Sequence, residues 1–404
     1  MRLVVTTESR FVRGAEGSVW TDCGIDYRFW RRYLDVFDSV TVLARVRDGA
    51  ERASGSLVNG PRVSVAALPY YTGAARFVLN APAILRVVRR TVRPGDAILY
   101  RVPSPVSNLV WRSIARGERP FGVEVVGDPD LVFAAGVMRH PLRPMMHRWA
   151  TRHLRAQCGS ACSAAYVTER ALQLKYPPDP EALSTVYSSI ELGPAAFADA
   201  PRPQRREPGA PYVIATVGSL EQNYKGVDIL IAAAADCRKR GLQLVLKIVG
   251  GGRLRPALQR QAASEGVRCE FTGQLPGPDA VRGVLDGADL FVLPSRTEGL
   301  PRALVEAMAR GLPCIGSQAG GIPELLDPED TVPAGDAAAL AAKMSEVVRD
   351  AARRERMAAR NLKAAAAYRP EALQRRRAAL YSHLRRCTEC WLGGAAGSPE
   401  RRIA

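Results

Sequence analysis

Short apolar runs alternate with longer helical patterns along almost the whole chain. Several of these runs are apolar throughout, as in strands that are buried on both faces of a sheet. Strands that alternate with helices pack as parallel sheets covered by helices, so the sequence predicts an α/β fold. The expected strands lie at residues 3–6, 40–43, 63–67, 97–101, 123–126, 164–168, 186–188, 212–217, 244–249, 269–272, 290–293 and 314–317.

A proline-rich segment divides the chain near its middle. Residues 200–211 hold four prolines and a glycine without apolar periodicity, which is typical of a linker. We therefore expect two doubly wound, Rossmann-like domains, at 1–199 and 212–367, that face each other across a cleft. A helix over 368–390 is expected to cross back to the first domain. The Gly- and Ser-rich residues 391–404 are expected to be a disordered tail.

Positive charge exceeds negative charge by 17 at neutral pH, which favours an anionic partner. The excess is shared by both halves and no zinc-finger or RNA-recognition signature accompanies it, so nucleic acid is not the expected partner. The sequence shows neither a membrane-spanning apolar run nor a signal-peptide pattern, so we expect a cytoplasmic protein. The cysteine pairs 158/162 and 387/390 are interpreted as buried or incidental thiols, with a four-thiolate zinc site as the alternative.

The strongest chemical signal is a strand, a loop and a helix over residues 290–311. Pro301 suits the first turn of the helix, and Gly311 follows its end. The amides of Gly299 and Leu300, with those of the first helical turn, present partial positive charge to an anion. The expected ligand at this helix start is a phosphate.

Two glutamates flank this turn. Glu298 precedes the helix, and Glu306 lies inside it among apolar residues. A carboxylate in apolar surroundings is costly unless it is hydrogen-bonded, and sugar hydroxyls are suitable donors. Together the two residues favour a sugar–diphosphate–ribose ligand. The alternative is that Glu298 caps the helix and Glu306 is a solvated surface charge.

With these features the sequence resembles retaining glycosyltransferases of the two-Rossmann (GT-B) type, and glycosyltransferase family 4 most of all. The resemblance covers residues 212–326 and is weaker before them. Besides the two glutamates, it rests on Gly218, Lys225, Gly226 and the segments 248–252, 271–273, 288–295 and 320–324.

The resemblance implies a role for each matching residue. Lys225 would bind the donor diphosphate, Glu298 the hydroxyls of the transferred sugar, and Glu306 the ribose of the nucleotide. The other expected donor-binding residues are Gly218, Ser219, Gly250, Gly251, Ser295, Gly299, Leu300 and Pro301. Of these residues, Lys225 and Glu298 are also the expected catalytic residues.

One departure from the family concerns charge. The family usually places an arginine six residues before the lysine, where this chain has Ser219. A hydroxyl can bond a phosphate, but it brings no positive charge. Arg253, Arg296 and Arg302 are all candidates to compensate. The departure also leaves open a catalytically impaired nucleotide-sugar-binding regulatory protein, whereas the paired glutamates disfavour a third candidate, a two-Rossmann epimerase.

The first half is expected to hold the acceptor. Asp128 follows an expected strand, and we regard it as a catalytic candidate that contacts the donor sugar or the acceptor hydroxyl. Asp128 and Asp130 also match an Asp-x-Asp metal motif, but the nucleotide signature lies in the other half, so no metal is expected. Gly14 and Gly17 form either an acceptor loop or an ordinary surface turn.

A long acid-free stretch includes residues 139–155. It carries Arg139, Arg143, Arg148, Arg152 and Arg155, together with Met145, Met146 and Trp149. A basic helix with an apolar side suits the surface of an anionic membrane, where each cation contributes about 1 kcal/mol. The alternative is an amphipathic helix packed on its own sheet, with a solvated charged face.

The resemblance therefore implies a retaining hexosyltransferase. It would move a sugar from a nucleotide-diphosphate donor to a glycan or an undecaprenyl-type lipid-linked acceptor, as in capsule or exopolysaccharide assembly. Neither a cofactor nor a metal is expected. The expected location is the cytoplasm, with peripheral contact to the inner face of the plasma membrane.

Overall fold

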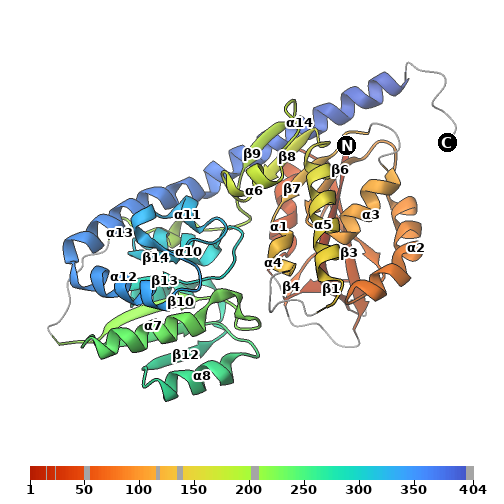
Figure 1. Cartoon of the computed structure of the whole chain (residues 1–404). Coiled ribbons are helices and arrows are strands. Elements are labelled where there is room, and N and C mark those ends of the chain that lie inside the picture. The colour runs from red at the N-terminus through yellow and green to blue at the C-terminus, as the bar shows by residue number, and fades with distance from the viewer. Residues whose placement is uncertain are drawn as a thin grey trace.

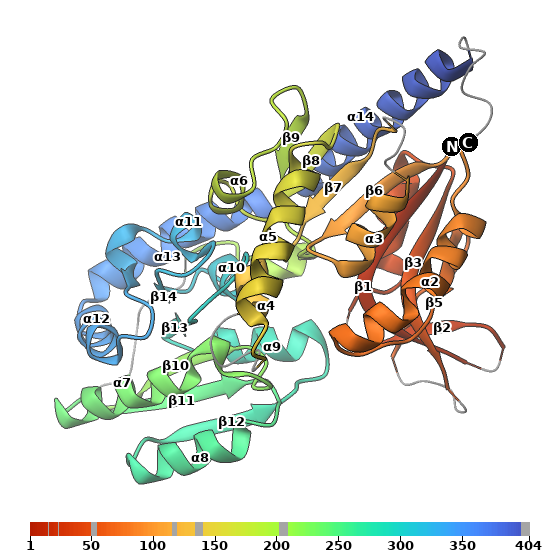
Figure 2. The same cartoon turned by 45° about the vertical axis from the view of Figure 1, so that its right-hand side comes forward.

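Two α/β domains lie side by side, and a long C-terminal helix extends from one to the other (Figures 1 and 2). This computed structural model describes residues 1–14, 16–22, 24–49, 55–114, 119–133, 140–201 and 209–396. Most of the expected linker, residues 202–208, lies outside the described residues. The predicted fold class, two Rossmann-like α/β domains, is confirmed.

The first sheet has nine strands, and seven of them form a parallel array in the order β5-β3-β1-β6-β7-β8-β9. The two short strands β2 and β4 extend it as an antiparallel ribbon on the end of β1. The strands are β1 (Arg2–Arg13), β2 (Val19–Thr21), β3 (Ser39–Asp48), β4 (Ser56–Leu57), β5 (Val63–Leu68), β6 (Ala97–Val102), β7 (Gly122–Val125), β8 (Ser163–Tyr166) and β9 (Leu183–Val186).

The second sheet is entirely parallel, in the order β12-β11-β10-β13-β14-β15. Its strands are β10 (Tyr212–Val217), β11 (Leu244–Val249), β12 (Cys269–Gly273), β13 (Leu290–Leu293), β14 (Cys314–Ser317) and β15 (Thr331–Val332). All four residues of β13 are buried, and they alternate between two apolar clusters on opposite faces of the sheet. This explains why the strand reads as a continuous apolar run in the sequence.

Helices cover both sheets. In the first domain, α2 (Ala74–Thr91), α3 (Pro105–Ile114) and α5 (Arg143–Cys158) lie side by side in Figure 1, and the shorter helices are α1 (Tyr27–Arg31), η1 (Arg32–Asp35), α4 (Pro129–Phe133) and α6 (Ala171–Lys175). The second domain contains α7 (Val227–Lys239), α8 (Arg255–Ser264), α9 (Gly277–Asp286), α10 (Arg302–Ala309), α11 (Ile322–Leu325), α12 (Ala337–Arg349) and α13 (Ala351–Ala365).

The C-terminal helix is longer than predicted. Helix α14 (Pro370–Ala396) starts beside the second domain and packs on β8 and β9 of the first. The expected disordered tail is therefore wrong for residues 391–396, which continue the helix, while 397–404 lie outside the described residues. Gly393 and Gly394 weaken a helix, but they do not end this one.

Two further sequence expectations need correction. The strand expected at 186–188 lies at Leu183–Val186, where half-exposed residues replace the apolar run that a buried strand shows. The strands β2, β4 and β15 are not predicted from the sequence, since two- or three-residue strands are too short to produce a pattern.

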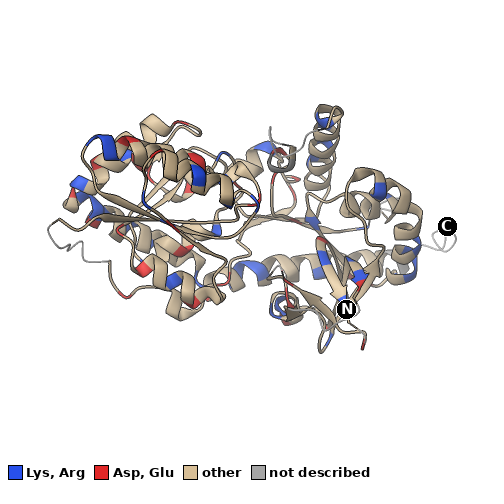
Figure 3. Cartoon of the chain, turned by 90° about the horizontal axis from the view of Figure 1, so that it is seen from below, with Lys and Arg blue, Asp and Glu red and all other residues tan. Residues whose placement is uncertain are grey.

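Among the described residues, no helix combines the length and apolar character that crossing a membrane requires. Lys and Arg occur over both domains (Figure 3).

A buried carboxylate joins α14 to the first sheet. Glu124 on β7 accepts hydrogen bonds from the hydroxyls of Tyr33 (3.1 Å), Tyr187 (2.9 Å) and Tyr381 (3.1 Å), and from the guanidinium of Arg101 (2.5 Å). The Glu124 side chain is 4% exposed and the Arg101 side chain 8%. Burial, with the charge of Glu124, raises the pKa of Tyr33 to about 12, so its hydroxyl remains a donor.

We expect Glu124→Ala to destabilise the fold by about 3–5 kcal/mol, because it leaves the Arg101 guanidinium buried without its carboxylate. Urea unfolding monitored by circular dichroism measures this loss. The matched control is Glu181→Ala, which removes an exposed glutamate in the same domain. Equal unfolding free energies for the two variants would show that the cluster adds nothing to stability.

Candidate functional site

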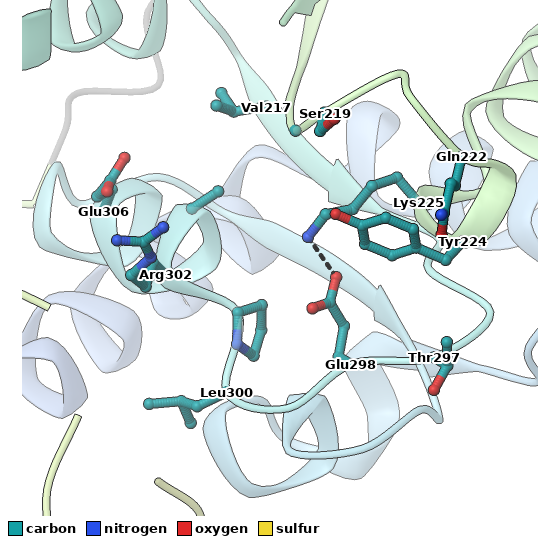
Figure 4. Close-up of a pocket in the computed structure, with 13 residues that line it drawn as sticks. Val217, Ser219, Gln222, Tyr224, Lys225, Thr297, Glu298, Leu300, Arg302 and Glu306 are labelled. Carbon is teal, nitrogen blue, oxygen red and sulfur yellow. Dashed lines mark hydrogen bonds and ion pairs between the residues drawn. The ribbon is translucent and has the colours of Figure 1, made fainter. Parts of the chain in front are cut away.

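One pocket lies at the carboxyl ends of β10 and β13. Its volume is about 760 Å³. These two strands are neighbours at the point where the strand order of the second sheet reverses, which is where open α/β sheets bind ligands. The lining residues are Val217, Gly218, Ser219, Gln222, Tyr224, Lys225, Thr297, Glu298, Leu300, Pro301, Arg302, Ala303 and Glu306 (Figure 4).

A lysine and a glutamate meet at one side of this pocket. The Lys225 ammonium lies 2.5 Å from Oε1 of Glu298, and the same oxygen accepts a hydrogen bond from the Ser295 hydroxyl at 2.7 Å. The two charged side chains are 14% and 8% exposed. Lys225 and Glu298 thus neutralise each other in a partly desolvated position and still present polar atoms to a ligand (Figure 4).

Local structure brings Lys225 to this position. It ends the short helix η4 (Asn223–Lys225), and the next residue, Gly226, has a left-handed backbone with φ of 66°. A Cβ atom at Gly226 would overlap the carbonyl oxygen of Pro294, so only glycine lets the start of α7 lie this close to the loop after β13. The lysine and the glutamate loop are therefore held together by backbone contact.

Glu306 lies at the opposite side of the pocket from Lys225 (Figure 4). Burial raises the pKa of its carboxyl, and the positive charge of Arg302 partly opposes this effect. Both residues belong to the first turns of α10, whose N-terminus has no side-chain cap. An uncapped helix start with its partial positive charge suits an anion, as the sequence analysis predicts.

Other predicted donor-binding residues support the pocket from behind. Gly250 bonds to Gly273 and lies directly against the carbonyl of Gly218, and the carbonyl of Gly251 accepts from the amide of Leu220 at 2.9 Å. Ser295 positions Glu298 through the hydrogen bond described above. Gly250, Gly251, Ser295 and Gly299 do not line the pocket itself, whereas Gly218, Ser219, Leu300 and Pro301 do.

The loop between Glu298 and Leu300 also touches the first domain. A Cβ atom at Gly299 would lie 3.9 Å from the carbonyl oxygen of Val126, which follows β7. Leu300 packs against the apolar core of the first domain. Nearby, the Glu324 carboxylate accepts hydrogen bonds from the amides of Arg170 (3.0 Å) and Ala171 (2.6 Å). The pocket is consequently at the boundary between the two domains.

The predicted first-domain residues do not join the pocket. Asp128 lies three residues after the end of β7, and its carboxylate already accepts hydrogen bonds from Lys175 (2.8 Å) and from the Tyr176 hydroxyl (2.7 Å). Asp130 bonds to Lys175 and to His147 (2.5 Å), and these contacts lower the pKa of its carboxyl against the opposing effect of burial. The Asp-x-Asp motif therefore holds a lysine.

The glycines of the expected acceptor loop form a hairpin turn between β1 and β2. The Gly14 amide donates to Ser18 at 2.9 Å and the Gly17 amide to Gly14 at 3.1 Å. Neither glycine lines the pocket, so the structure does not bring Gly14 or Gly17 to the donor side. Over the described part of the chain, no cluster of three or more His, Cys, Asp or Glu side chains has the arrangement of a metal site.

Besides the apolar Val217 and Ala303, sequence reasoning missed three residues that line the pocket: Gln222, Tyr224 and Thr297. Each lies within three positions of Lys225 or Glu298, so its place in the same loop was the only available signal. Burial, and the negative charge of Glu298, raise the pKa of Tyr224. Its ring lies 5.2 Å from the Lys225 ammonium.

Comparison with known proteins places this geometry in context. Residues 211–350 match the family "Glycosyl transferases group 1". The match includes every residue that lines the pocket. The two-domain fold resembles that of sucrose-phosphate synthase from Thermosynechococcus elongatus, with a TM-score of 0.69 and 18% identity, over 95% of this chain and 99% of that one. The chain therefore has the two-domain GT-B arrangement.

Two sequence relatives extend the comparison. The chain is 26% identical to Protein CapJ of Staphylococcus aureus over 308 residues, which cover 74% of each protein. It is 35% identical over 157 residues to the putative colanic acid biosynthesis glycosyltransferase WcaL of Salmonella typhimurium. That alignment covers 36% of this chain and 38% of WcaL, so it spans well under half of WcaL.

We expect inorganic pyrophosphate to raise the melting temperature, because the start of α10 and Lys225 provide positive charge in one pocket. A ligand at about 100 times its dissociation constant stabilises a protein by about 2.7 kcal/mol. Scanning fluorimetry measures the shift of each variant against its own ligand-free value. Lys225→Ala should reduce it, whereas Lys239→Ala, at an exposed position ending α7, should not. A shift that survives in Lys225→Ala would place the anion elsewhere.

Proposed function

We propose that this protein is a retaining family 4 hexosyltransferase that uses a nucleotide-diphosphate sugar. The observation that carries the proposal is that one pocket, at the start of α10, brings together Lys225, Glu298 and Glu306. The match to group 1 glycosyl transferases supports the reaction class. The name of WcaL supports a place in polysaccharide biosynthesis.

Each of the three side chains binds a different part of the donor. Glu298 accepts hydrogen bonds from hydroxyls of the transferred sugar, Lys225 binds the diphosphate, and Glu306 accepts from the ribose. This order follows the pocket from the Lys225–Glu298 side to Glu306 (Figure 4). When the donor binds, sugar hydroxyls and phosphate oxygens replace the contact between Lys225 and Glu298.

The proposed transfer depends on stabilising the leaving nucleoside diphosphate and uses no protein nucleophile. The bond between the anomeric carbon and the diphosphate oxygen breaks, and negative charge builds on the nucleoside diphosphate. Lys225 and the amides of the α10 start stabilise that charge. The acceptor oxygen attacks from the face that the diphosphate leaves, and its proton passes to a diphosphate oxygen, so the configuration is retained. Closure of the two domains excludes water, which would otherwise hydrolyse the donor.

Asp128 belongs to the acceptor side in this proposal. Because its oxygens already accept from Lys175 and Tyr176, we assign it to hold the loop after β7 beside the pocket, instead of taking the acceptor proton. A glycan or lipid-linked acceptor would approach between this loop and Glu298.

Lys225→Ala and Glu306→Ala are each expected to lower the rate of transfer about 100-fold or more, the loss typical of removing one group that stabilises a transition state. Release of nucleoside diphosphate from a panel of UDP-, GDP-, dTDP- and ADP-sugars, with and without glycan acceptors, measures it. Glu355→Ala, on an exposed face of α13, is the control. Near wild-type turnover in either pocket variant would overturn the assignment. Donor binding without release in the wild-type protein would favour the alternative, a regulatory nucleotide-sugar-binding protein.

A lipid-linked acceptor is the second part of the proposal, and the three helices α2, α3 and α5 support it. Together they contain nine arginines and no acidic residue. Their outer surface also exposes large apolar side chains: Leu79 is 79% exposed, Val78 66%, Met145 60% and Trp149 43%. We name this surface, formed by α2, α3 and α5, the basic face.

A groove of about 430 Å³ runs between the three helices. Phe77, Leu85, Leu109 and Trp149 supply apolar walls, and Arg89 and Arg112 stand at the same groove. Apolar side chains next to positive charges complement a membrane surface with anionic headgroups, such as the cytoplasmic leaflet of the plasma membrane. The groove extends the expected surface beyond residues 139–155. Helix α5 itself starts at Arg143, and Arg139 lies outside the described residues.

We expect the protein to float with vesicles that contain an anionic lipid at low salt, and not with purely zwitterionic vesicles. Arg148→Gln combined with Arg152→Gln should lower the partition coefficient about 30-fold, from about 1 kcal/mol for each cation near the surface. The control, Arg260→Gln with Arg356→Gln, removes the same charge from exposed positions of the second domain. Failure to float, or equal loss in the control, would end the membrane part of the proposal.

A further inference from the structure

The donor pocket contains too little positive charge that is free to meet a diphosphate. This step rests on the proposed function. The charged residues that line the pocket are Lys225, Glu298, Arg302 and Glu306. Lys225 is held by Glu298 at 2.5 Å, so the glutamate offsets most of its charge. The diphosphate of a nucleotide sugar carries two negative charges, which a single neutralised lysine meets poorly.

Two arginines near the pocket are committed to other partners. Arg296 forms a two-pronged ion pair with Asp228, at 2.7 and 2.8 Å, and also donates to the carbonyl of Asn223. Arg253 donates to the carbonyl of Glu221 at 2.8 Å. Neither arginine lines the pocket. Both side chains stabilise the loop that carries Lys225 or its neighbours, and neither faces a ligand.

Arg302 is different. It is the first residue of α10, its side chain lines the pocket, and it is exposed. Figure 4 shows its guanidinium between Glu306 and the turn at Leu300. Within the described residues it forms no hydrogen bond or salt bridge. Its positive charge reaches both sides of the pocket. It lowers the pKa of Glu306 and of Tyr224, against the burial that raises both.

We propose that Arg302 is the second cation of the donor site and binds the phosphate next to the ribose. The position follows from geometry, because Glu306 is the ribose partner and Arg302 lies one helical turn before it, at i and i+4. A guanidinium offers two parallel N–H donors to two oxygens of one phosphate, and it keeps its charge throughout the reaction. Arg302 therefore stabilises the nucleoside diphosphate as it leaves, and it neither gives nor takes a proton.

This assignment explains how the pocket functions with Ser219 on the opposite loop. Ser219 lines the pocket after β10, and its hydroxyl already accepts the amide of Glu221 at 3.2 Å. A hydroxyl in that place supplies no charge. The cation comes instead from the helix start on the other side of the diphosphate, where the partial charge of the α10 amides adds to it.

The assignment is tested by moving the cation. Arg302→Ala is expected to weaken pyrophosphate binding and to slow transfer, each about 100-fold, whereas Arg302→Lys should lose less of the binding than of the rate because it keeps charge without the fork. The double variant Arg302→Ala with Ser219→Arg returns a guanidinium to the same pocket from the opposite loop. It should recover transfer to within about tenfold of the wild type.

Calorimetric titration with inorganic pyrophosphate and release of nucleoside diphosphate from the preferred sugar donor give the two readouts. Arg260→Ala, at an exposed position of the second domain, is the matched control and should equal the wild type in both. If Arg302→Ala binds pyrophosphate and transfers sugar as well as the wild-type protein does, Arg302 is not the second cation, and the proposed function stands. If the wild-type protein binds no pyrophosphate and turns over no donor, the proposed function itself fails. A double variant that folds but recovers nothing would also overturn the assignment.

Discussion

Close backbone contact in the loop after β13 determines where the functional groups lie. Gly320 has a φ of 53°, and a Cβ atom there would overlap the carbonyl of Glu298. Gly321 donates to the carbonyl of Gly299 at 2.8 Å. Because no side chain separates these two backbone segments, the loop that carries Glu298 lies directly against the segment after β14. From this loop the Glu298 carboxylate points toward Lys225 (Figure 4).

A second constraint, helix α14, connects the two domains. Helix α14 leaves the second domain and is held to the first by three hydrogen bonds. The Tyr381 hydroxyl donates to the Glu124 carboxylate. Arg377 donates to the carbonyl of Ser188 (2.8 Å), and Arg385 donates to the carbonyl of Val36 (2.6 Å). Each of these bonds joins residues that are far apart in the sequence. Since Val126, two residues after Glu124, lies beside Gly299, the strand that anchors α14 also leads to the segment that contacts the loop carrying Glu298.

The sequence contained the local part of this architecture and little of the long-range part. The pattern of β13, the proline and glycine around α10, and the positions of Lys225, Glu298 and Glu306 are all contiguous features, so spacing and family resemblance were sufficient to identify them. The partners of Glu124 come from four separate segments of the chain, and one glutamate within an apolar strand gives no indication of three tyrosines elsewhere. For the same reason nothing in the sequence indicates that Lys175, 47 residues later, binds the carboxylate of Asp128, the residue expected to contact the donor sugar or the acceptor hydroxyl.

The ion pair in the pocket also bears on selectivity for the donor. Lys225 and Glu298 are mostly buried, so a ligand that separates them must satisfy both, because an unpaired charge in such a position is costly. In the proposed function, a sugar diphosphate does this: phosphate oxygens receive the ammonium and sugar hydroxyls donate to the carboxylate. A nucleotide without a sugar satisfies the lysine and leaves Glu298 with the Ser295 hydroxyl alone. In that proposal, the pair favours the sugar-bearing donor over the spent nucleotide, and this difference would help the product leave after transfer.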